Sequence, residues 1–294
     1  SVAAIWGNPP IADTLRAKVR NRLLDRTIYL DTMEINEGSV RRFVGDWRRT
    51  TPRVIFGHSH SIYVLAMYLH RLGVEDVRPR GIISTSMMLL EPERRLIEKV
   101  FRCPVTNRYG CEEVGLIACE CEQHEGLHLN MDHVLVEFLT DDGAEAAPNE
   151  EANIVVTDLV NRGMPLIRYR IGDMGVPSDR MCPCGRGLQL MERVTGRQAD
   201  FLKRPDGSLV AGVSLVERTL TAIPGIEQMQ LVQDALHHVC AKVVRDENFS
   251  EASNLTLCNE LQAVFGADVA IEIQFVPVLE QTRRGKYRFA ICNA

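Results

Sequence analysis

The sequence predicts an α/β fold in which a parallel sheet covered by helices is followed by a mixed or antiparallel β subdomain and then by a small α+β domain. Three observations support this prediction. Short apolar runs alternate with helical patterns as far as about residue 116, extended segments separated by turns follow, and a new alternation starts near residue 201. Strands that alternate with helices are typical of parallel βαβ units, whereas successive extended segments favour a mixed or antiparallel sheet.

The first region predicts alternating strands and helices. An apolar residue at every fourth position between Ile11 and Leu23 forms one stripe of a helix, and Gly73 supplies the stop signal of another. Pro92 stands in the first turn of a third helix. A backbone N–H in this turn has no acceptor within the helix, so proline removes no hydrogen bond there. The predicted order after the first helix is strand 53–57, a helix ending before Gly73, strand 80–85, helix 91–101 and strand 105–109.

The second and third regions differ from the first in their pattern. Residues 132–140 and 153–159 predict strands, and a loop rich in Cys, Pro and Gly at 178–187 interrupts this region. From about residue 201 the predicted order is helix 214–222, strand 226–232, strand 236–244, helix 251–265 and strand 268–277, the last with alternating apolar residues. We therefore expect two domains, residues 1–199 and residues 200–294.

The composition restricts the class of protein. The chain has 294 residues, of which 45% are hydrophobic and 25% charged, as in ordinary globular proteins. Its net charge of −5 argues against nucleic acid or an anionic membrane as a partner, because both favour a basic surface. No apolar run approaches the roughly 20 residues that a membrane helix needs, and no signal peptide opens the chain. We therefore expect no membrane partner and a cytoplasmic location.

Four of the nine cysteines form two close pairs, Cys119 with Cys121 and Cys182 with Cys184. In a reducing compartment such pairs favour metal binding over a disulfide. Structural zinc takes four sulfur or nitrogen ligands, commonly from two short-spaced pairs. The tight turn around Pro183 would let the thiolates of Cys182 and Cys184 point to one side.

The other zinc ligands would come from the segment "ECEQHEGLH" (120–128). Cys121 and His124 have a Cys-x-x-His spacing, His128 is the alternative imidazole, and Cys119 is an alternative thiolate. The competing interpretation is that these side chains are buried thiols and solvated histidines. Four protein ligands leave no open coordination position, so the predicted role of the metal is structural.

Four stretches place polar groups at the ends of strands or on loops, and each by itself is an ordinary turn or solvated loop. They are "NRYGCEEVG" (107–115), "PLIRYRIGDM" (165–174), "VTGRQADFL" (194–202) and "LEQTRRGKYRFA" (279–290). In this order, and together with "GIISTSMML" (81–89) and "CPCGRG" (182–187), they make the chain resemble the adenylate-forming superfamily of acyl- and aryl-CoA ligases. It is most similar to the phenylacetate–coenzyme A ligase-like branch. The resemblance covers almost the whole chain and the C-terminal half of a member.

The resemblance implies an ATP-dependent ligase that activates a carboxylic acid. Such an enzyme forms an acyl- or aryl-adenylate and then transfers the acyl group to coenzyme A or another acceptor. The implied cofactors are ATP, Mg²⁺ and CoA, the implied partner is a small-molecule carboxylic acid, and a homodimer is possible. Residues 1–199 would be the remainder of the large nucleotide-binding domain, truncated at its N-terminus, and residues 200–294 the mobile C-terminal α+β domain.

The resemblance also implies roles for residues near the predicted strand 105–109. Glu113 corresponds to the carboxylate that holds Mg²⁺ against the ATP phosphates, and oxygen ligands suit such a hard cation. Tyr109 and Gly110 would line the adenine side. The other nucleotide-binding residues implied nearby are Ser84, Thr85 and Ser86.

Further roles implied by the resemblance lie later in the chain. Asp173 corresponds to the aspartate whose two oxygens accept from the ribose hydroxyls, and Arg197 would bind ribose or phosphate. Asp200 corresponds to the hinge between the domains. Lys286 corresponds to the lysine that bridges the substrate carboxylate and the α-phosphate during adenylation. The branch resembles the cysteine-rich segment most strongly at Cys121 and His128, which favours His128 as the fourth zinc ligand.

Two features depart from the family pattern. Glu112 stands where most of the superfamily has Thr or Ser near the α-phosphate, and no Gly/Ser/Thr-rich phosphate loop occurs in the sequence. We therefore expect the chain to be part of a longer enzyme and to be inactive in adenylation by itself. The alternative function is a non-catalytic nucleotide-binding or scaffold domain derived from the same fold.

The segment "GHSHS" (57–61) suggests a different enzyme class. It follows a predicted strand and precedes a helix, as the nucleophile elbow of a serine hydrolase does, but it lacks the second glycine of G-x-S-x-G. We therefore expect Ser59 to cap the following helix and His58 to line the acyl-substrate side of the cleft.

Overall fold

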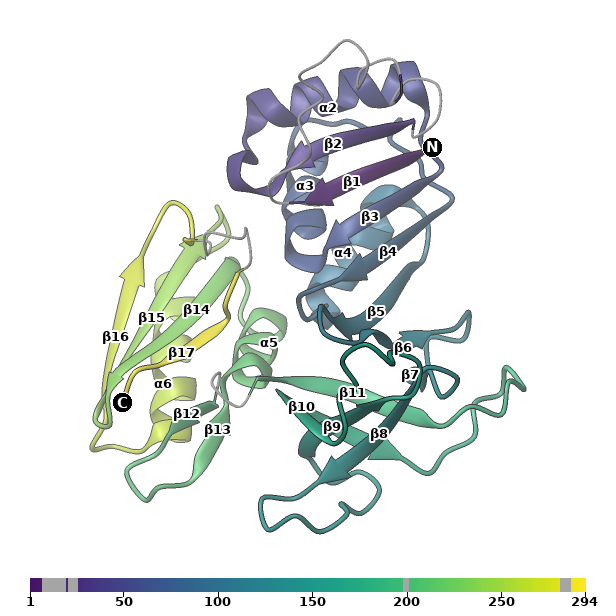
Figure 1. The fold of residues 1–294 in the computed structure, drawn as a ribbon. Helices are drawn as coiled ribbons and strands as arrows, with labels where there is room; N and C mark the ends of the chain where they lie inside the picture. The colour runs from purple at the N-terminus through teal and green to yellow at the C-terminus, as the bar shows by residue number, and fades with distance from the viewer. Residues whose placement is uncertain (7–19, 21–25, 198–200, 281–286) are drawn as a thin grey trace.

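The computed structural model describes residues 1–6, 20, 26–197, 201–280 and 287–294. Within these residues the strands form an eleven-stranded, a four-stranded and a two-stranded sheet. Figure 1 shows three regions: a parallel sheet with helices, a group of antiparallel strands that continues it, and a separate small α/β unit beside them.

The N-terminal region is built on five parallel strands in the order β2-β1-β3-β4-β5. The strands are β1 (Val2–Trp6), β2 (Thr27–Asp31), β3 (Val54–His58), β4 (Gly81–Thr85) and β5 (Val105–Cys111). Between them lie the 3₁₀-helix η2 (Thr32–Glu34), α2 (Glu37–Thr50), α3 (Ser59–Arg71) and α4 (Glu91–Phe101). Alternate strand residues such as Ile5 and Ile55 are completely buried together with Ile62, Ile97 and Phe101 from the helices.

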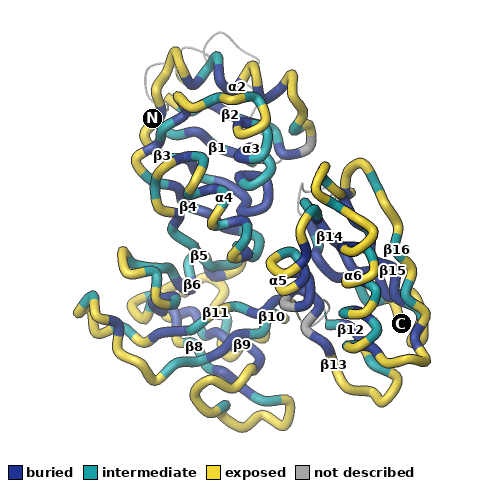
Figure 2. Tube along the Cα trace, turned by 180° about the vertical axis from the view of Figure 1, so that it is seen from behind, coloured by how far each residue is buried: buried dark blue, intermediate teal, exposed yellow. Residues whose placement is uncertain are grey.

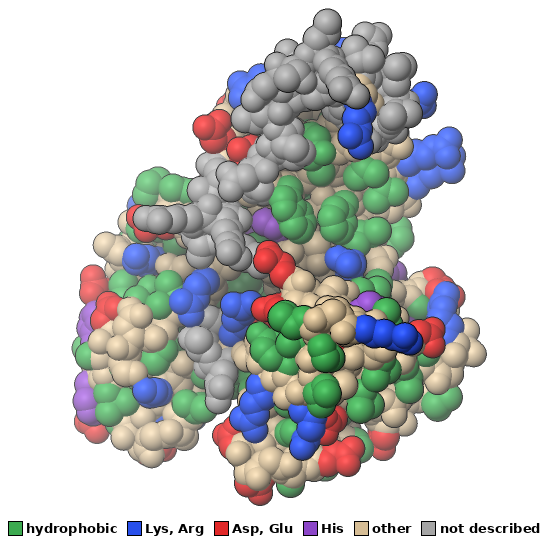
Figure 3. All heavy atoms as spheres, viewed as in Figure 1, with side chains coloured by type: hydrophobic (Ala, Val, Ile, Leu, Met, Phe, Trp, Pro, Cys, Tyr) green, Lys and Arg blue, Asp and Glu red, His purple; other side chains and the backbone are tan. Residues whose placement is uncertain are grey.

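The opposite face of this parallel sheet carries half-buried apolar side chains. Trp6 stacks on Phe56 with ring centroids 5.5 Å apart, and Ile83 of β4 is also half-buried. In Figure 1, α3 and α4 lie behind the sheet, and Figure 3 shows hydrophobic side chains on the face toward the viewer. The predicted helical cover is therefore confirmed for one face of the sheet.

Antiparallel strands extend the large sheet in the order β5-β6-β7-β11-β10-β9-β8. They are β6 (Gly115–Glu120), β7 (Leu127–Leu129), β8 (Val134–Leu139), β9 (Ala152–Asp158), β10 (Tyr169–Ser178) and β11 (Leu190–Arg197). Figure 2 shows buried residues along these strands and exposed residues in the loops between them. The predicted change to a mixed sheet after residue 116 is thus observed.

The small unit has its own core around a four-stranded sheet in the order β16-β15-β14-β17. Its elements are β12 (Phe201–Lys203), β13 (Leu209–Ala211), α5 (Gly212–Ala222), β14 (Ile226–Ala235), β15 (His238–Arg245), α6 (Glu251–Phe265), β16 (Ala270–Phe275) and β17 (Ala290–Cys292). The predicted helix 251–265 coincides with α6, whose first turn is capped by Ser250 and Ser253. The predicted boundary at residue 199 stays a prediction, since residues 198–200 lie outside the described part of the chain.

The small unit contacts the large region through α3 and α4. Leu90, immediately before α4, is fully buried in the hydrophobic cluster of the small unit. Tyr63 of α3 donates a hydrogen bond of 3.0 Å to the carbonyl of Glu227, and Arg71 forms an ion pair with the same glutamate. The small unit is therefore held against α3 and α4 by both apolar and polar contacts.

Several sequence expectations differ from the structure. The stretch 165–174 was expected to end an apolar strand in Tyr169, Gly172 and Asp173, but β10 begins only at Tyr169, and Ile167 before it is 72% exposed. Ser59 does not cap α3: its hydroxyl donates to the carbonyl of Met87 at 2.9 Å, and the cap residue His58 makes no side-chain capping bond. The predicted helix between Ile11 and Leu23 falls largely outside the described residues. No helix in the described ranges is both long and apolar enough to cross a membrane.

Candidate functional site

A sharp hairpin between β5 and β6 presents the first candidate residues. A Cβ atom added to Gly110 would lie 2.1 Å from the carbonyl oxygen of Gly115, so only glycine fits this backbone approach. The register pairs Cys111 with Gly115, and Glu113 lies exposed in the turn between them. The turn therefore places Glu113 at the carboxyl end of a parallel strand, the usual ligand edge of an open α/β sheet.

Tyr109, Asp173 and Arg197 meet at this edge although they come from three distant motifs. The Tyr109 hydroxyl donates to Oδ2 of Asp173 at 2.8 Å, and Nε of Arg197 lies 3.3 Å from Oδ1 of the same carboxylate. Antiparallel pairing of β10 with β11 sets Asp173 directly opposite Arg197. Strand pairing thus brings Asp173 and Arg197 together, and the Tyr109 hydroxyl reaches Asp173 from β5. All three residues were predicted from the sequence to belong to one nucleotide site.

The environment determines the charge of two of these groups. Burial, and then the adjacent Asp173 carboxylate, raises the pKa of Tyr109 far above its usual range, so its hydroxyl stays a neutral donor. The pKa of Glu113 is lowered by its own backbone N–H and by the thiol of Cys111, and the hydroxyl of Tyr169 donates to it at 3.4 Å. An exposed, ionised carboxylate of this kind can act as a ligand of a hard cation.

The end of β4 lies beside this cluster. Ser84 is paired with Asn107 in the parallel register of β4 and β5, and both Ser84 and Thr85 are buried. Ser86 has a positive φ of 66°, which turns the chain toward Met88. A Cβ atom added to Gly196 would lie 3.8 Å from the sulfur of Met88, so this turn borders β11 next to Arg197.

Two buried hydroxyls in this region have no hydrogen-bond partner among the described residues. They are Oγ of Ser84 and Oγ1 of Thr195. Buried hydroxyls are usually paired, and an unpaired one is costly. Ser84 was predicted from the sequence as a site residue. Thr195 and Tyr169 were given no role, although both lie within the quoted motifs that contain Asp173 and Arg197.

Lys286 and Asp200 lie outside the described residues, so their predicted roles stay predictions. Glu112 is exposed in the hairpin next to Glu113. Figure 3 shows acidic and basic side chains close together where the large and small regions meet.

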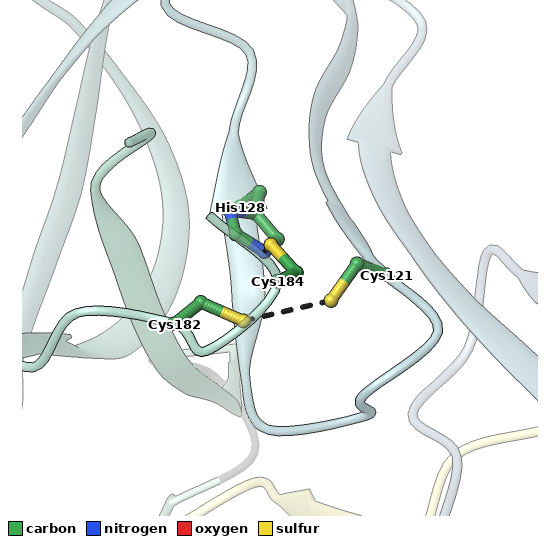
Figure 4. Close-up of side chains that lie close together, drawn as sticks. All are labelled: Cys121, His128, Cys182 and Cys184. Carbon is green, nitrogen blue, oxygen red and sulfur yellow. Dashed lines mark hydrogen bonds between the residues drawn. The ribbon is translucent and has the colours of Figure 1, made fainter. Parts of the chain in front are cut away.

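A second cluster combines one histidine and three cysteines. The ligand atoms of Cys121, His128, Cys182 and Cys184 all lie within 4.8 Å of one another (Figure 4). The sulfur atoms of Cys121 and Cys182 are 3.6 Å apart, and Sγ of Cys184 lies 3.4 Å from Nε2 of His128. These sulfur atoms are too distant for a disulfide, whose S–S bond is about 2.05 Å long.

The geometry of this cluster fits a tetrahedral zinc ion. With Zn–S and Zn–N bonds of about 2.3 and 2.05 Å, tetrahedral angles require sulfur atoms about 3.8 Å apart and sulfur–nitrogen pairs about 3.6 Å apart. The observed 3.6 and 3.4 Å are each close to these values. All four side chains are buried or half-buried, as a closed structural site requires.

Local structure explains how the four ligands converge. Cys121 follows β6, His128 lies in β7, and pairing of β7 with β11 sets Leu190 opposite His128. Cys182 and Cys184 lie in a turn closed by a hydrogen bond from the N–H of Gly185 to the carbonyl of Cys182.

The two alternative ligands are placed differently. Nδ1 of His124 lies 2.9 Å from a carboxylate oxygen of Glu120, away from the four-residue cluster. Cys119 faces His128 across the β6–β7 pair but is not among the clustered ligands. The structure therefore brings together the set with His128 rather than the sets with His124 or Cys119.

Known proteins share both the sequence and the fold. A family model described as the CapK C-terminal domain matches residues 202–293. Protein CapK of Staphylococcus aureus is 26% identical over 260 residues, which cover 87% of this chain and 56% of the relative. A phenylacetate–coenzyme A ligase of Thermus thermophilus is 30% identical over 170 residues, covering 52% of this chain and 37% of that protein. The chain thus spans little more than half of the first relative and less of the second.

Solved structures share the fold at low sequence identity. A 2-hydroxyisobutyryl-CoA ligase in the postadenylation state, in complex with 2-HIB-AMP, superposes with a TM-score of 0.74 at 16% identity, covering 99% of this chain and 65% of that one. The same ligase in the thioesterification state, with coverage of 99% and 64%, gives a TM-score of 0.55. The sequence relatives and the shared fold together confirm the predicted resemblance of this chain to the adenylate-forming superfamily, on its phenylacetate–coenzyme A ligase-like branch.

Proposed function

We propose that this protein uses ATP to activate a small carboxylic acid as an acyl- or aryl-adenylate and then transfers the acyl group to coenzyme A or another acceptor. One observation supports the proposal above the others: Tyr109, Asp173 and Arg197 meet at the carboxyl edge of a parallel sheet. The sequence relatives support carboxylate activation as the reaction class.

Asp173 would bind the ribose of the nucleotide. Each carboxylate oxygen can accept more than one hydrogen bond, so Asp173 could accept from ribose hydroxyls as well as from Tyr109. The Tyr109 hydroxyl would keep the carboxylate in its orientation, and the Tyr109 ring would line the adenine side. Arg197, which is 66% exposed, would reach ribose or phosphate.

The adenylation step is an in-line displacement at the α-phosphorus. A substrate carboxylate oxygen forms a bond to this phosphorus while the bond to the oxygen that bridges to the β-phosphorus breaks, and pyrophosphate leaves. Lys286 would hold the attacking carboxylate beside the α-phosphate. Glu113 would hold Mg²⁺, which reduces the negative charge on the phosphates. In the second step the acceptor attacks the acyl carbon, and AMP leaves.

Pyrophosphate release tests this proposal. Two forms of the protein are prepared: the 294-residue chain, and a longer form that includes any residues encoded upstream of it. Each form is incubated with ATP, Mg²⁺ and a panel of aryl and fatty acids. We expect the longer form to release pyrophosphate with at least one acid and to form an acyl-CoA when CoA is added, and we expect no release by the 294-residue chain alone. Lys286→Ala should lower the rate by about 10²- to 10³-fold, the usual loss when one transition-state contact is removed. Lys99→Ala, at an exposed position of α4, is the matched control.

A scaffold or non-catalytic nucleotide-binding domain is the second candidate function. The exposed Glu112 favours it, because a carboxylate near the α-phosphate repels an anion. Binding of ATP without pyrophosphate release, with every acid and in both forms of the protein, would support this second function and refute the ligase.

We further propose that Cys121, His128, Cys182 and Cys184 hold a structural zinc ion. The closeness of the four ligand atoms supports this assignment, as do the S–S separation of 3.6 Å and the S–N separation of 3.4 Å. Such an ion would pin the turn at 182–185 to the β6–β7 hairpin. Because all four positions are protein ligands, the ion would take no part in the ligase chemistry.

A further inference from the structure

A buried, hydrogen-bonded pair of polar side chains lies at the junction of the two regions and has no part in the candidate sites above. Nδ1 of His60 in α3 is 2.6 Å from Oε1 of Glu93 in α4, and the two side chains are only 4% and 2% exposed. The second oxygen of Glu93 is buried without a hydrogen-bond partner among the described residues. Burying such polar groups has a desolvation cost, so their presence raises the question of another role.

Aromatic side chains of the small unit cover the His60 ring. The Tyr287 ring stacks on it with centroids 4.4 Å apart and an interplanar angle of 13°. Phe289 meets His60 edge-on at 5.8 Å and Tyr287 edge-on at 4.9 Å. Tyr63, whose ring lies 5.7 Å from His60, also donates a hydrogen bond to the small unit. The imidazole is therefore enclosed by rings from both regions.

Tyr287 is fixed to the small unit at its other end. Its hydroxyl donates to the carbonyl of Met229 in β14 at 3.0 Å, and the side chain is 6% exposed. Burial raises the pKa of Tyr287 well above its usual range, so the hydroxyl remains a donor. The ring thus connects β14 of the small unit to the imidazole that Glu93 orients in the large region.

We propose that Glu93, His60 and Tyr287 are positioning residues for adenylation, because together they hold Tyr287, the residue that directly follows Lys286, against α3 and α4. Tyr287 directly follows Lys286 in the sequence, so the stack on His60 fixes one end of the peptide that bears the lysine. This inference rests on the proposed function in assigning Lys286 to adenylation. The contact between the rings does not depend on that assignment.

The two regions are arranged more as in one state of a solved relative than as in another. The chain superposes better on the relative in its postadenylation state than on the same relative in its thioesterification state, over the same share of residues. The stack joins the two regions in the arrangement that resembles the earlier of these states, so its loss should affect adenylation more than acyl transfer.

The experiment compares the two half-reactions in four variants of the full protein. Tyr287→Leu removes the ring, Tyr287→Phe keeps it, and His60→Asn removes the imidazole while leaving an amide that can still donate to Glu93. The fourth variant combines Tyr287→Leu with His60→Asn. ATP–pyrophosphate exchange reports adenylation, thioester formation from a supplied acyl-adenylate reports transfer, and thermal unfolding reports folding.

We expect Tyr287→Leu and His60→Asn each to slow exchange by about two- to tenfold, the range for loss of one aromatic contact. Transfer should change by less than about twofold, and Tyr287→Phe, which keeps the ring on His60 and loses only the bond to Met229, should slow exchange less than Tyr287→Leu does. The double variant should be little worse than either single one, because both remove the same contact. Equal losses in both half-reactions, or fully additive losses, would show a general structural effect and overturn the proposal.

Hydrogen exchange separates this inference from the proposed function. In the wild type, amides of residues 287–292 and of the first turns of α3 should be protected together. Tyr287→Leu should raise exchange in both segments, and Tyr287→Phe, which keeps the stack, should leave the first turns of α3 protected. If the wild type supports no pyrophosphate exchange, the ligase proposal fails, and this measurement still decides whether the docking contact exists: unchanged protection in Tyr287→Leu refutes it.

Discussion

Replacing Cys182 by serine is expected to remove a bound zinc ion and to destabilise the antiparallel region. The prediction depends on the ligand spacing: S–S and S–N separations of 3.6 and 3.4 Å are each within about 0.2 Å of those around tetrahedral zinc. The turn that holds Cys182 and Cys184 is connected to the β6–β7 hairpin through this cluster. Removing one ligand therefore breaks the connection that the metal ion makes between the turn and the hairpin.

The size of the effect follows from the linkage of binding and folding. If free zinc exceeds its dissociation constant about a thousandfold, binding stabilises the folded state by about 4 kcal/mol. For a domain of about 200 residues this corresponds to a fall in Tm of about 8–16 °C when the ion is lost. Chelation of zinc from the wild type should produce the same fall, and chelation should leave Cys182→Ser unchanged.

The assay is metal analysis and thermal unfolding of protein purified without an affinity tag. The wild type should contain about one zinc ion per chain, and Cys182→Ser close to none. Cys258→Ala, a half-buried cysteine of α6 outside the cluster, is the matched control and should keep its zinc. Less than about half an equivalent of zinc in the wild type, or an unchanged Tm after chelation, would refute the assignment.

Three other perturbations test the structure and the candidate site. Tyr109→Phe removes a hydrogen bond to the charged Asp173 carboxylate and should lower the free energy of unfolding by about 1.5–3 kcal/mol in urea titrations, together with weaker ATP binding; an unchanged affinity would argue against a nucleotide role. Asn36→Ala removes the side-chain acceptor at the start of α2 and should cost about 1 kcal/mol, measured in the same way; a neutral effect would contradict the capping box. Two backbone N–H groups lower the pKa of Asp158 in the folded state. The ionised carboxylate therefore stabilises the fold at pH values above the pKa of the unfolded carboxyl, and this stability is lost as the pH falls through the lower pKa of the folded state. Asp158→Asn should reduce that acid-dependent loss, and an identical pH profile of Tm would contradict this reasoning.

Much of the secondary structure was predictable because its signals are local. The helix expected at 91–101 is α4, with Pro92 in its first turn and Ile97 and Phe101 buried. Helix α2 was not predicted, although Val40, Val44 and Trp47 mark a buried stripe at helical spacing that could have revealed it. β10 begins only at Tyr169. The apolar residues before it, which were expected to form a strand, are exposed and have no strand partner.

The candidate sites were predictable as residue sets and not as contacts. The motifs around Tyr109, Asp173 and Arg197 were recognised separately, but nothing in the sequence states that one carboxylate accepts from both of the other two side chains. The Cys-x-x-His spacing favoured His124, and the family resemblance favoured His128. In the structure His124 is hydrogen-bonded to Glu120, and His128 lies beside Cys184.

By itself the sequence determined the α/β class, the order of most strands and helices, and the chemical types gathered in each motif, since burial periodicity and turn signals act over a few residues. Only the tertiary structure decided that β7 pairs with β11 and β10 with β11, which brings a histidine next to a cysteine 56 positions later and Asp173 opposite Arg197. It likewise decided that Tyr287 stacks on His60. These contacts depend on strand order and on how the two regions pack, and such long-range geometry follows from the free energy of the whole fold and not from any local stretch of residues.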